Sequence, residues 1–392
     1  MIYTNFQDKK LPLLGFGAMR LPEISDGEID VAQVEEMVAL CMEQGVNYFD
    51  TAYPYHAGNS ERVMGKILSQ YPRDSYYLAT KYPGHMIVKS YDPKATFEEQ
   101  LQKCGVEYFD FYLLHNVSEA TMATYLDPKW GILDYFLEQK KLGRIRHLGF
   151  SAHARLSGLE AFLDACGEHM EFCQIQLNYL DWTLQDAKGK YELLTSRGIP
   201  VWVMEPVRGG KLANFQNADM KAMRPEESIA AWGFRFLQGL DNVQMVLSGM
   251  SNMEQLKDNL ATFAERKPLK ADELKLVFAV ADVMKNAIPC TKCRYCCDGC
   301  PMGLDIPLMM GVCSELRFAE SVNSAMILQF TPENKQPSAC ISCGKCTKVC
   351  PQGIDIPKVM KELVERLNQI PKWLDICKKR EEEQEKSRQA VK

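Results

Sequence analysis

The apolar positions in roughly the first 250 residues follow two periods, and this pattern predicts strands that alternate with helices. Short runs rich in β-branched and aromatic residues recur, and each is followed by an amphipathic segment of helical length. In residues 31–44, for example, apolar side chains from Val31 to Met42 share one helical face, and Gly45 ends the helix. The predicted strands are LLGFGAM (13–19), VNYFDTA (46–52), YYLATK (76–81), FDFYLLH (109–115), IRHLGFS (145–151), FCQIQLN (172–178), PVWVMEP (200–206) and VQMVLSG (243–249).

Eight strands, each followed by a helix, fit a (β/α)8 barrel of the α/β class within about 240 residues. A doubly wound sheet also alternates strands with helices, but it has fewer strands and a glycine-rich first turn. The first predicted strand, LLGFGAM, lacks the G-x-G-x-x-G pattern of such a turn. The sequence therefore predicts a TIM barrel.

The chain changes character after the barrel. The segment from 251 to 288 reads as helix, and Pro289 blocks its continuation. Two cysteine runs follow, separated by a segment of helical character, and the last fifteen residues are almost wholly polar. We therefore expect a barrel at 1–265, a helical linker at 266–289, a small and mainly α-helical domain at 290–371, and a charged tail at 372–392.

The cysteines are unevenly distributed, with four of the fifteen in residues 1–289 and eleven in the rest of the chain. The N-terminus MIYTNFQDKK lacks a basic stretch followed by an apolar one, so we expect no secretion signal. In a reducing compartment, clustered thiols indicate metal binding rather than disulfides.

The two cysteine runs share the spacing C-x2-C-x2-C-x3-C-P, which is typical of bacterial proteins with two [4Fe–4S] clusters. The two-residue gaps let three thiolates meet at one cluster, and the fourth cysteine reaches the other cluster. Such crossed ligation predicts two sets of ligands. One set is Cys290, Cys293, Cys296 and Cys350, and the other is Cys340, Cys343, Cys346 and Cys300.

Zinc is the weaker alternative for these runs. Two C-x-x-C pairs complete one tetrahedral zinc site and leave the other cysteines of each run unused. Cys297, next to Cys296, makes the register of the first run ambiguous, but only Cys296 preserves the symmetry between the runs. We expect Cys297, Cys313 and Cys377 to be buried thiols rather than ligands.

Each run ends in a G-x-D-I-P motif that leads into a predicted helix. The glycine permits a turn, Asp305 or Asp355 caps the helix, and Pro307 or Pro357 lies in its first turn. This half of the chain resembles the dicluster ferredoxin family. Its long insert between the runs is similar to the α-helical ferredoxin modules in the iron–sulfur subunits of succinate dehydrogenase and fumarate reductase.

Polar residues stand at the carboxyl ends of consecutive predicted strands, where the active sites of barrels lie. Asp50, Lys81 and His115 end three strands, and Tyr55 follows in the loop after the first of them. A tyrosine has a reference pKa of about 10. We expect the Lys81 ammonium to favour the Tyr55 phenolate and Asp50 to hold that ammonium in place. A histidine is able to orient a carbonyl oxygen or relay a proton.

With these residues the chain resembles the aldo-keto reductase family over about residues 1–265. The matching segments are FDTAYPY (49–55), ATK (79–81), LLH (113–115), GFS (149–151), QIQLNY (174–179) and SGMSNMEQLKDNL (248–260). The resemblance implies that Tyr55 is the general acid, that Lys81 and Asp50 tune it, and that His115 helps to place the carbonyl. It also implies hydride transfer from bound NAD(P)H.

The same resemblance implies a set of cofactor-binding residues. Ser151 and Gln174 would bond the nicotinamide carboxamide, and the backbone near Arg208 and Ser248 would line the phosphate site. The full set, carried over by motif position, is Ser151, Gln174, Met204, Arg208, Gly209, Gly210, Ser248, Gln255 and Asn259.

The chain departs from the family pattern at several of these positions. Met204 stands where many members stack an aromatic ring on the nicotinamide, and Ala152 and His153 replace the usual residues after GFS. Gly249 and Gln255 replace the Lys and Arg that bind the 2′-phosphate in many NADPH-dependent members. NADH is therefore open as the cofactor, although Lys257 is a possible substitute.

Charge and hydropathy exclude some classes of partner. The net charge is near −5 without a basic stripe, so we expect no nucleic-acid partner. No run of about 18 apolar residues occurs, so we expect no membrane span. Oxygen-labile clusters and the lack of an export signal predict a cytoplasmic protein.

Three functions remain open from the sequence. The first is a carbonyl reductase or alcohol dehydrogenase that exchanges electrons through its clusters with a ferredoxin or a flavoprotein. A flavin, for which the chain has no readable motif, would couple hydride to single electrons. The second is an ordinary carbonyl reductase with structural or redox-sensing clusters. The third is an electron-transfer adaptor with a non-catalytic barrel, against which the intact set of strand-end residues argues.

Overall fold

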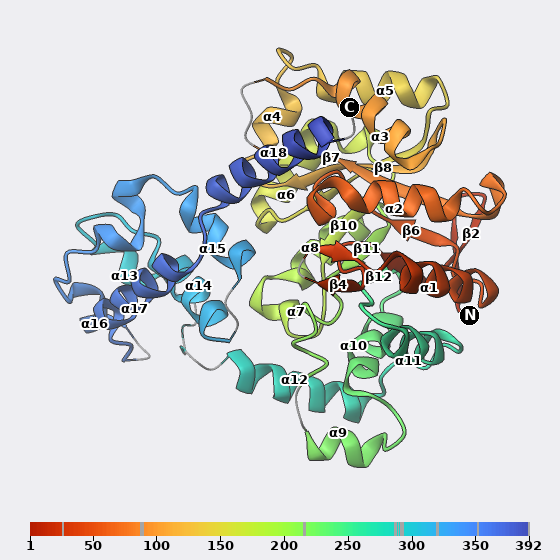
Figure 1. The fold of residues 1–392 in the computed structure, drawn as a ribbon. Coiled ribbons are helices and arrows are strands. Elements are labelled where there is room, and N and C mark those ends of the chain that lie inside the picture. Colours follow the sequence, from red (N-terminus) through yellow and green to blue (C-terminus); the bar gives the residue numbers. More distant parts are fainter. Residues whose placement is uncertain are drawn as a thin grey trace. The chain divides into compact units, whose positions relative to one another are not determined.

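The computed structural model describes residues 1–25, 27–86, 90–214, 217–285, 288, 290, 294–318, 321–350 and 353–390. The chain divides into two compact units, Met1–Leu276 and Val277–Lys392. Figure 1 traces both units in the order of the sequence.

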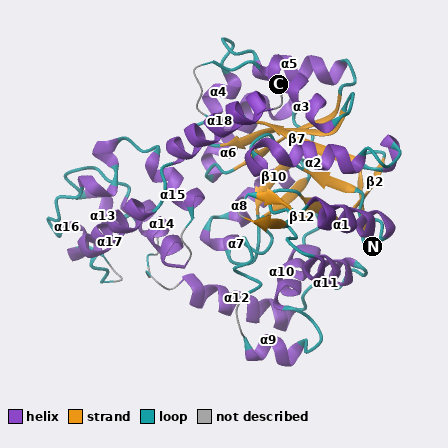
Figure 2. Cartoon of the chain, in the orientation of Figure 1, coloured by secondary structure: helices purple, strands orange, loops and turns teal. Residues whose placement is uncertain are grey.

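The first unit is built on a closed barrel of eight parallel strands, which Figure 2 shows enclosed by helices. Each strand overlaps one of the eight predicted runs, so the prediction of a TIM barrel is confirmed. The barrel follows chain order and closes between its first and last strands. The strands are β3 (Leu14–Gly17), β6 (Tyr48–Asp50), β7 (Tyr77–Tyr82), β8 (Phe109–Val117), β9 (Ile145–Ala152), β10 (Cys173–Gln176), β11 (Val201–Met204) and β12 (Val243–Ser248).

The barrel helices begin and end at local signals in the sequence. In α1 (Val31–Glu43) the Asp30 side chain accepts a hydrogen bond from the Gln33 amide at 3.0 Å. The predicted apolar face is correct at its centre, but Met37 is buried in it while Val31 and Met42 are only half-buried. The other helices of this unit are α2 (Asn59–Leu68), α3 (Pro93–Cys104), α4 (Met122–Leu126), α5 (Ile132–Lys141), α6 (Leu156–Cys166), α7 (Asp181–Leu184), α8 (Ala187–Ser196), α9 (Ala218–Met223), α10 (Ile229–Gln238) and α11 (Met253–Phe263).

An N-terminal hairpin, not predicted from the sequence, fills the barrel from one end. Its strands β1 (Tyr3–Phe6) and β2 (Lys9–Pro12) pair antiparallel. The Phe6 ring lies edge-on to Trp202, with ring centroids 5.0 Å apart, and also packs against Phe111 and Phe172. The Trp202 indole donates a hydrogen bond to the Tyr48 hydroxyl at 3.1 Å. A second short hairpin joins β4 (Glu23–Ser25) to β5 (Glu28–Ile29).

The described part of the second unit consists of helices joined by loops, in agreement with the predicted mainly α-helical domain. Its apolar core combines residues of α14 and α17 with several cysteines, and Arg317 of α14 pairs with Glu362 of α17 at 2.5 Å. Helix α12 (Ala271–Lys285) crosses the boundary between the two units. The helices that follow are α13 (Tyr295–Asp298), α14 (Ile306–Phe318), α15 (Val322–Gln329), α16 (Lys345–Lys348), α17 (Ile356–Gln369) and α18 (Trp373–Ala390).

The two G-x-D-I-P motifs have the predicted local structure. Gly303 and Gly353 have φ angles of +57° and +63°, in the left-handed region that favours glycine. Asp305 accepts a hydrogen bond from the Leu308 amide and Asp355 one from the Lys358 amide, both at 3.3 Å. Each motif therefore begins a helix, α14 in one copy and α17 in the other.

The region predicted as a charged tail is helix α18. Trp373 and Cys377 near its start are buried, so this end of the helix belongs to the fold.

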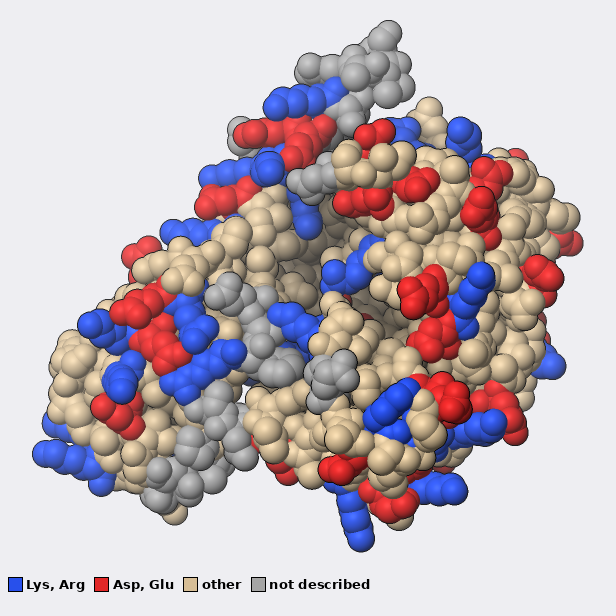
Figure 3. All heavy atoms as spheres, turned by 60° about the horizontal axis from the view of Figure 1, so that its bottom comes forward, with Lys and Arg blue, Asp and Glu red and all other residues tan. Residues whose placement is uncertain are grey.

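Cys313 is buried as predicted, whereas Cys297 is only half-buried because the short helix α13 leaves it near the surface. None of the described helices has the length and apolar character needed to cross a membrane. Basic and acidic side chains are interspersed over the face in Figure 3.

Candidate functional site

Four predicted polar residues converge at one end of the barrel. Asp50 is the last residue of β6, Lys81 lies in β7, and His115 lies in β8. These strands are parallel neighbours, so their carboxyl ends lie at the same end of the barrel. Tyr55 begins the short helical turn Tyr55–Gly58 that follows β6.

Lys81 is the centre of this group. Its ammonium donates to Asp50 Oδ1 at 2.5 Å and to the Thr51 carbonyl at 2.8 Å, and it lies 3.4 Å from the Tyr55 hydroxyl. The His115 ring lies edge-on to the Tyr55 ring, with centroids 5.9 Å apart. The structure thus brings together all four residues of the predicted set.

Burial decides the protonation of the group. Burial by itself lowers the pKa of Lys81, but Asp50 and Tyr55 outweigh it and raise that pKa above its usual value. Burial also raises the pKa of Tyr55, and the Lys81 ammonium offsets this only in part. Lys81 favours the Tyr55 phenolate, as expected, but the loss of hydration of the phenolate on burial outweighs this attraction, so the pKa of Tyr55 is raised above its usual value. Tyr55 is held as a phenol next to a cation.

A second histidine, missed from the sequence, lies beside His115. His85 is only 3% exposed, and its ring centroid is 4.4 Å from that of His115. The Tyr125 hydroxyl supports the same region through a hydrogen bond to the His115 carbonyl. His85 follows the carboxyl end of β7, and this position is the sequence signal from which it could have been predicted.

A cavity of about 740 Å³ opens beside Tyr55 and Asp50 and extends along the carboxyl ends of β11 and β12. Seven of the nine residues predicted to bind the cofactor line it. They are Gln174, Met204, Gly209, Gly210, Ser248, Gln255 and Asn259.

Ser151 and Arg208, the other two predicted residues, are not among the residues that line the cavity. The Ser151 hydroxyl accepts a hydrogen bond from the Asn116 amide at 2.8 Å, and Arg208 donates to Asp181 at 3.3 Å. Ser151 is nevertheless paired in register with Gln174 of the adjacent strand.

The lining of the cavity has groups suited to a nicotinamide nucleotide. The buried Oε1 atom of Gln174 has no hydrogen-bond partner among the described residues, so it is available to accept a bond from a carboxamide. At Gly17 an added Cβ would lie 3.2 Å from the Ser248 carbonyl, so a side chain there would crowd this wall. Asn259 donates to the Ser248 hydroxyl at 2.8 Å and holds it in place.

The charges at the other end of the cavity are mostly acidic. Arg20, which the sequence did not single out, lines the cavity and pairs with Glu205 at 3.2 Å. Glu254 and Asp258 line the same region, and Gln255 uses its Oε1 to accept a bond from the Ser251 amide. A 2′-phosphate would meet few free cations here.

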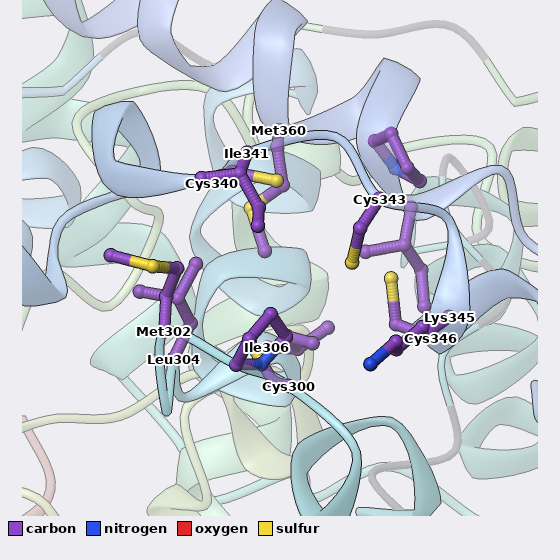
Figure 4. A pocket seen from close by; sticks show the side chains of 13 residues that line it. Cys300, Met302, Leu304, Ile306, Cys340, Ile341, Cys343, Lys345, Cys346 and Met360 are labelled. Carbon is purple, nitrogen blue, oxygen red and sulfur yellow. The ribbon is translucent and has the colours of Figure 1, made fainter.

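Four cysteines of the second unit surround a separate small cavity, which Figure 4 shows. They are Cys300, Cys340, Cys343 and Cys346, together with apolar side chains such as Leu304 and Met360. These four cysteines are one of the two predicted sets of crossed ligands. Cys300 comes from the first run, and the other three come from the second run.

The other predicted set is described in part, because Cys293 lies outside the described residues. Cys296 is buried in the apolar core of this unit, and Cys290 and Cys350 pack against that core. Cys297 packs there as well.

Comparisons with known proteins match both units. Residues 13–228 match the aldo/keto reductase family, and residues 289–354 match a 4Fe-4S dicluster domain. An L-galactose dehydrogenase of Arabidopsis thaliana is 26% identical over 309 residues, covering 71% of this chain and 92% of the relative. An NADH-specific methylglyoxal reductase of Escherichia coli K12 is 24% identical over 266 residues, covering 55% and 78%. The holo form of an aldo-keto reductase from Bacillus halodurans shares the barrel fold, with a TM-score of 0.57 at 24% identity, covering 71% of this chain and 96% of that structure.

Proposed function

This chain is an oxidoreductase of the aldo/keto reductase family with a 4Fe-4S dicluster domain, and from that premise we propose that it reduces a carbonyl compound with NADH. The observation that carries the proposal is the contact of Lys81 with both Asp50 and Tyr55 beside the large cavity. The reverse reaction, oxidation of an alcohol, uses the same groups.

In this proposal, Tyr55 donates the proton that the reduced carbonyl oxygen requires. The phenol is protonated before reaction, and the Lys81 ammonium stabilises the phenolate that remains. Asp50 holds Lys81, and His115 orients the carbonyl oxygen. Bound NADH would supply a hydride to the carbonyl carbon. Water then reprotonates Tyr55.

The choice of NADH over NADPH rests on the charges along the cavity. Arg20 is engaged by Glu205, and Glu254 and Asp258 would repel a 2′-phosphate. The similar methylglyoxal reductase of E. coli is described as NADH-specific, which agrees with this choice. Gln174, whose Oε1 is unpartnered among the described residues, is proposed to contact the nicotinamide carboxamide, and Asn259 to support the phosphate site through Ser248.

We also propose two [4Fe–4S] clusters, one on Cys300, Cys340, Cys343 and Cys346, the other on Cys290, Cys293, Cys296 and Cys350. The four thiols around the small cavity suit such a cluster, since each iron takes one thiolate. Clusters supply one electron at a time, whereas hydride carries two. A flavin, bound in this barrel or on a partner protein, would couple the two.

A second candidate function is that of a carbonyl reductase whose clusters are structural. The position of the cysteines in the apolar core of the second unit favours it, because a cluster there would cross-link α14 and α17. Cys343→Ser distinguishes the two functions. If the clusters are only structural, Cys343→Ser leaves NADH-dependent carbonyl reduction unchanged and no electron exchange with an external one-electron carrier is lost. If the cluster transfers electrons, the variant stops that exchange.

The decisive experiment starts with anaerobic purification and an assay of iron, sulfide and flavin. We expect about eight iron atoms per chain.

NADH should bind at least 10-fold more tightly than NADPH in a fluorescence titration. Tyr55→Phe should lower kcat for carbonyl reduction by about 10²–10⁴-fold while NADH binding is retained. Full activity of this variant would refute the role of Tyr55, and tighter binding of NADPH would refute the choice of cofactor.

A further inference from the structure

The second cysteine run carries exposed side chains, some apolar and some basic. Ile341 is 59% exposed and Val349 is 50% exposed, which is unusual for side chains of this size. Cys343 lies between them in the sequence and is itself exposed. We call Ile341, Cys343, Lys345, Lys348 and Val349 the second-run face. Exposed apolar groups within a charged rim are typical of a protein–protein interface.

Lys345 and Lys348 give this face a positive charge. They lie three residues apart on α16, so both side chains leave the same side of that helix. Both are exposed, and within the described part of the chain neither ammonium is paired with a carboxylate. Lys345 also lines the cavity that holds the four cysteines, as Figure 4 shows.

The first run has no lysine at the two equivalent positions although its cysteine spacing is identical. Tyr295 and Asp298 occupy the positions that Lys345 and Lys348 occupy in the second run. The first run has Lys292, which lies outside the described residues, and Arg294, which pairs with Asp305 at 3.3 Å. The duplicated motif therefore differs in charge between its copies, and this difference belongs to the surface rather than to cluster ligation.

Among the predicted cluster cysteines that the structure describes, Cys343 of the second run is the exposed one. A ligand thiolate that is exposed, such as Cys343, brings the cluster to the surface of the protein. Electron transfer between proteins slows steeply as the distance between the redox centres grows. A carrier that docks on the second-run face would hold its own redox centre close to the cluster.

We infer that the second-run face docks a small acidic carrier protein of the ferredoxin class. The inference rests on the proposed electron-transferring clusters. In the exchange, one reduced carrier loses one electron and the cluster on Cys300, Cys340, Cys343 and Cys346 gains it. No bond forms or breaks. The lysines attract the acidic carrier and steer its approach, and the apolar side chains form the centre of the contact.

The test is the rate at which a reduced acidic plant-type [2Fe–2S] ferredoxin reduces the oxidised, cluster-loaded protein in anaerobic stopped flow. Lys348→Glu is the informative variant, because Lys348 does not line the cluster cavity. We expect it to lower the second-order rate constant about 10-fold or more at low ionic strength. Lys378→Glu makes the same change of charge at an exposed position of α18 and should have little effect.

Two further measurements sharpen the test. Added salt should slow the wild-type reaction and leave the Lys348→Glu reaction less affected. Val349→Ser, at an exposed position that does not line the cluster cavity, should slow the reaction but retain the salt dependence of the wild type, because it removes apolar contact and not charge.

The outcomes separate this inference from the function on which it rests. If excess dithionite reduces the clusters in every variant but the ferredoxin rate is the same in wild type, Lys348→Glu and Lys378→Glu, the docking face is refuted and the clusters stand. A faster exchange with basic cytochrome c than with ferredoxin would also refute it. A protein purified without iron would refute the proposed clusters themselves.

Discussion

Lys81 is a fully buried cation whose charge depends on two neighbours. An isolated buried ammonium would lose its proton, but Asp50 at 2.5 Å and Tyr55 raise the pKa of Lys81. The same burial raises the pKa of Tyr55. The pair therefore rests as ammonium and phenol, which is the state that a general acid needs before it donates.

The pH dependence of carbonyl reduction follows from the raised pKa of Tyr55. Tyr55 must be protonated to donate, and its pKa lies above the usual value of about 10, so we expect kcat/KM to stay level up to about pH 9 and to fall only at higher pH. In Asp50→Asn/Lys81→Met, which removes both charges together, the fall should shift to still higher pH while the rate drops. A fall centred below pH 8 in the wild type would contradict this assignment.

Glu171 joins several elements of the barrel at the end that the hairpin fills. Its carboxylate accepts hydrogen bonds from the Leu148 amide and from Gln7, and it pairs with His147 at 2.9 Å and Lys140 at 2.8 Å. Burial acts to raise the pKa of Glu171, but these partners outweigh it and hold that pKa at about 2.

Because the pKa of Glu171 is lower in the folded protein than in the unfolded chain, the folded protein becomes less stable as the pH falls. The carboxylate stabilises the folded barrel above the unfolded pKa of about 4.5, and that contribution is lost as pH falls toward 2. We expect Glu171→Gln to lower the free energy of unfolding by about 3 kcal/mol at pH 7. Urea unfolding followed by tryptophan fluorescence should show this gap closing between pH 4.5 and 2. A gap that is constant across that range would show that the loss is not electrostatic.

At the scale of whole elements, the period of the apolar positions predicted the barrel strands, and the capping residues predicted where two helices begin. All eight predicted runs overlap a barrel strand, because each buried parallel strand reads as a short apolar run. The observed strands are mostly shorter than the runs, since their ends continue into loops that are also buried. The caps at Asp305 and Asp355 were predictable because a cap acts within three residues of sequence.

For the whole molecule, the crossed arrangement of cysteines predicts which cluster each residue supports. Cys300 belongs to the first run but lines the cavity with the three cysteines of the second. Cys300→Ser should therefore lower iron content from about eight to about four atoms per chain. Electron paramagnetic resonance of the reduced protein should lose the coupling between two clusters.

Cys297→Ser provides the matched control for this prediction. Cys297 is half-buried beside the core but does not line the cavity of the four cysteines, so its replacement should retain both clusters. Loss of iron from Cys297→Ser, or an unchanged iron content in Cys300→Ser, would contradict the proposed ligand sets.

Several features were decided by contacts between distant parts of the chain. The Phe6 side chain fills the barrel against Trp202, almost two hundred residues away, and no local pattern marks it. His85 and Arg20 lie in loops, and only folding brings them to the site. Ser151 and Arg208 were carried over by motif position, yet in the fold they bond to Asn116 and Asp181 and do not line the cavity.

The sequence by itself determined the barrel, the helical second unit, the spacing of the cysteines and the set Asp50, Tyr55, Lys81 and His115. These features follow from periodicity, short-range caps and motifs, which act over a few residues. Only the tertiary structure decided that burial raises the pKa of Tyr55 and that Phe6 fills the barrel against Trp202, because burial and packing depend on residues far apart in the chain.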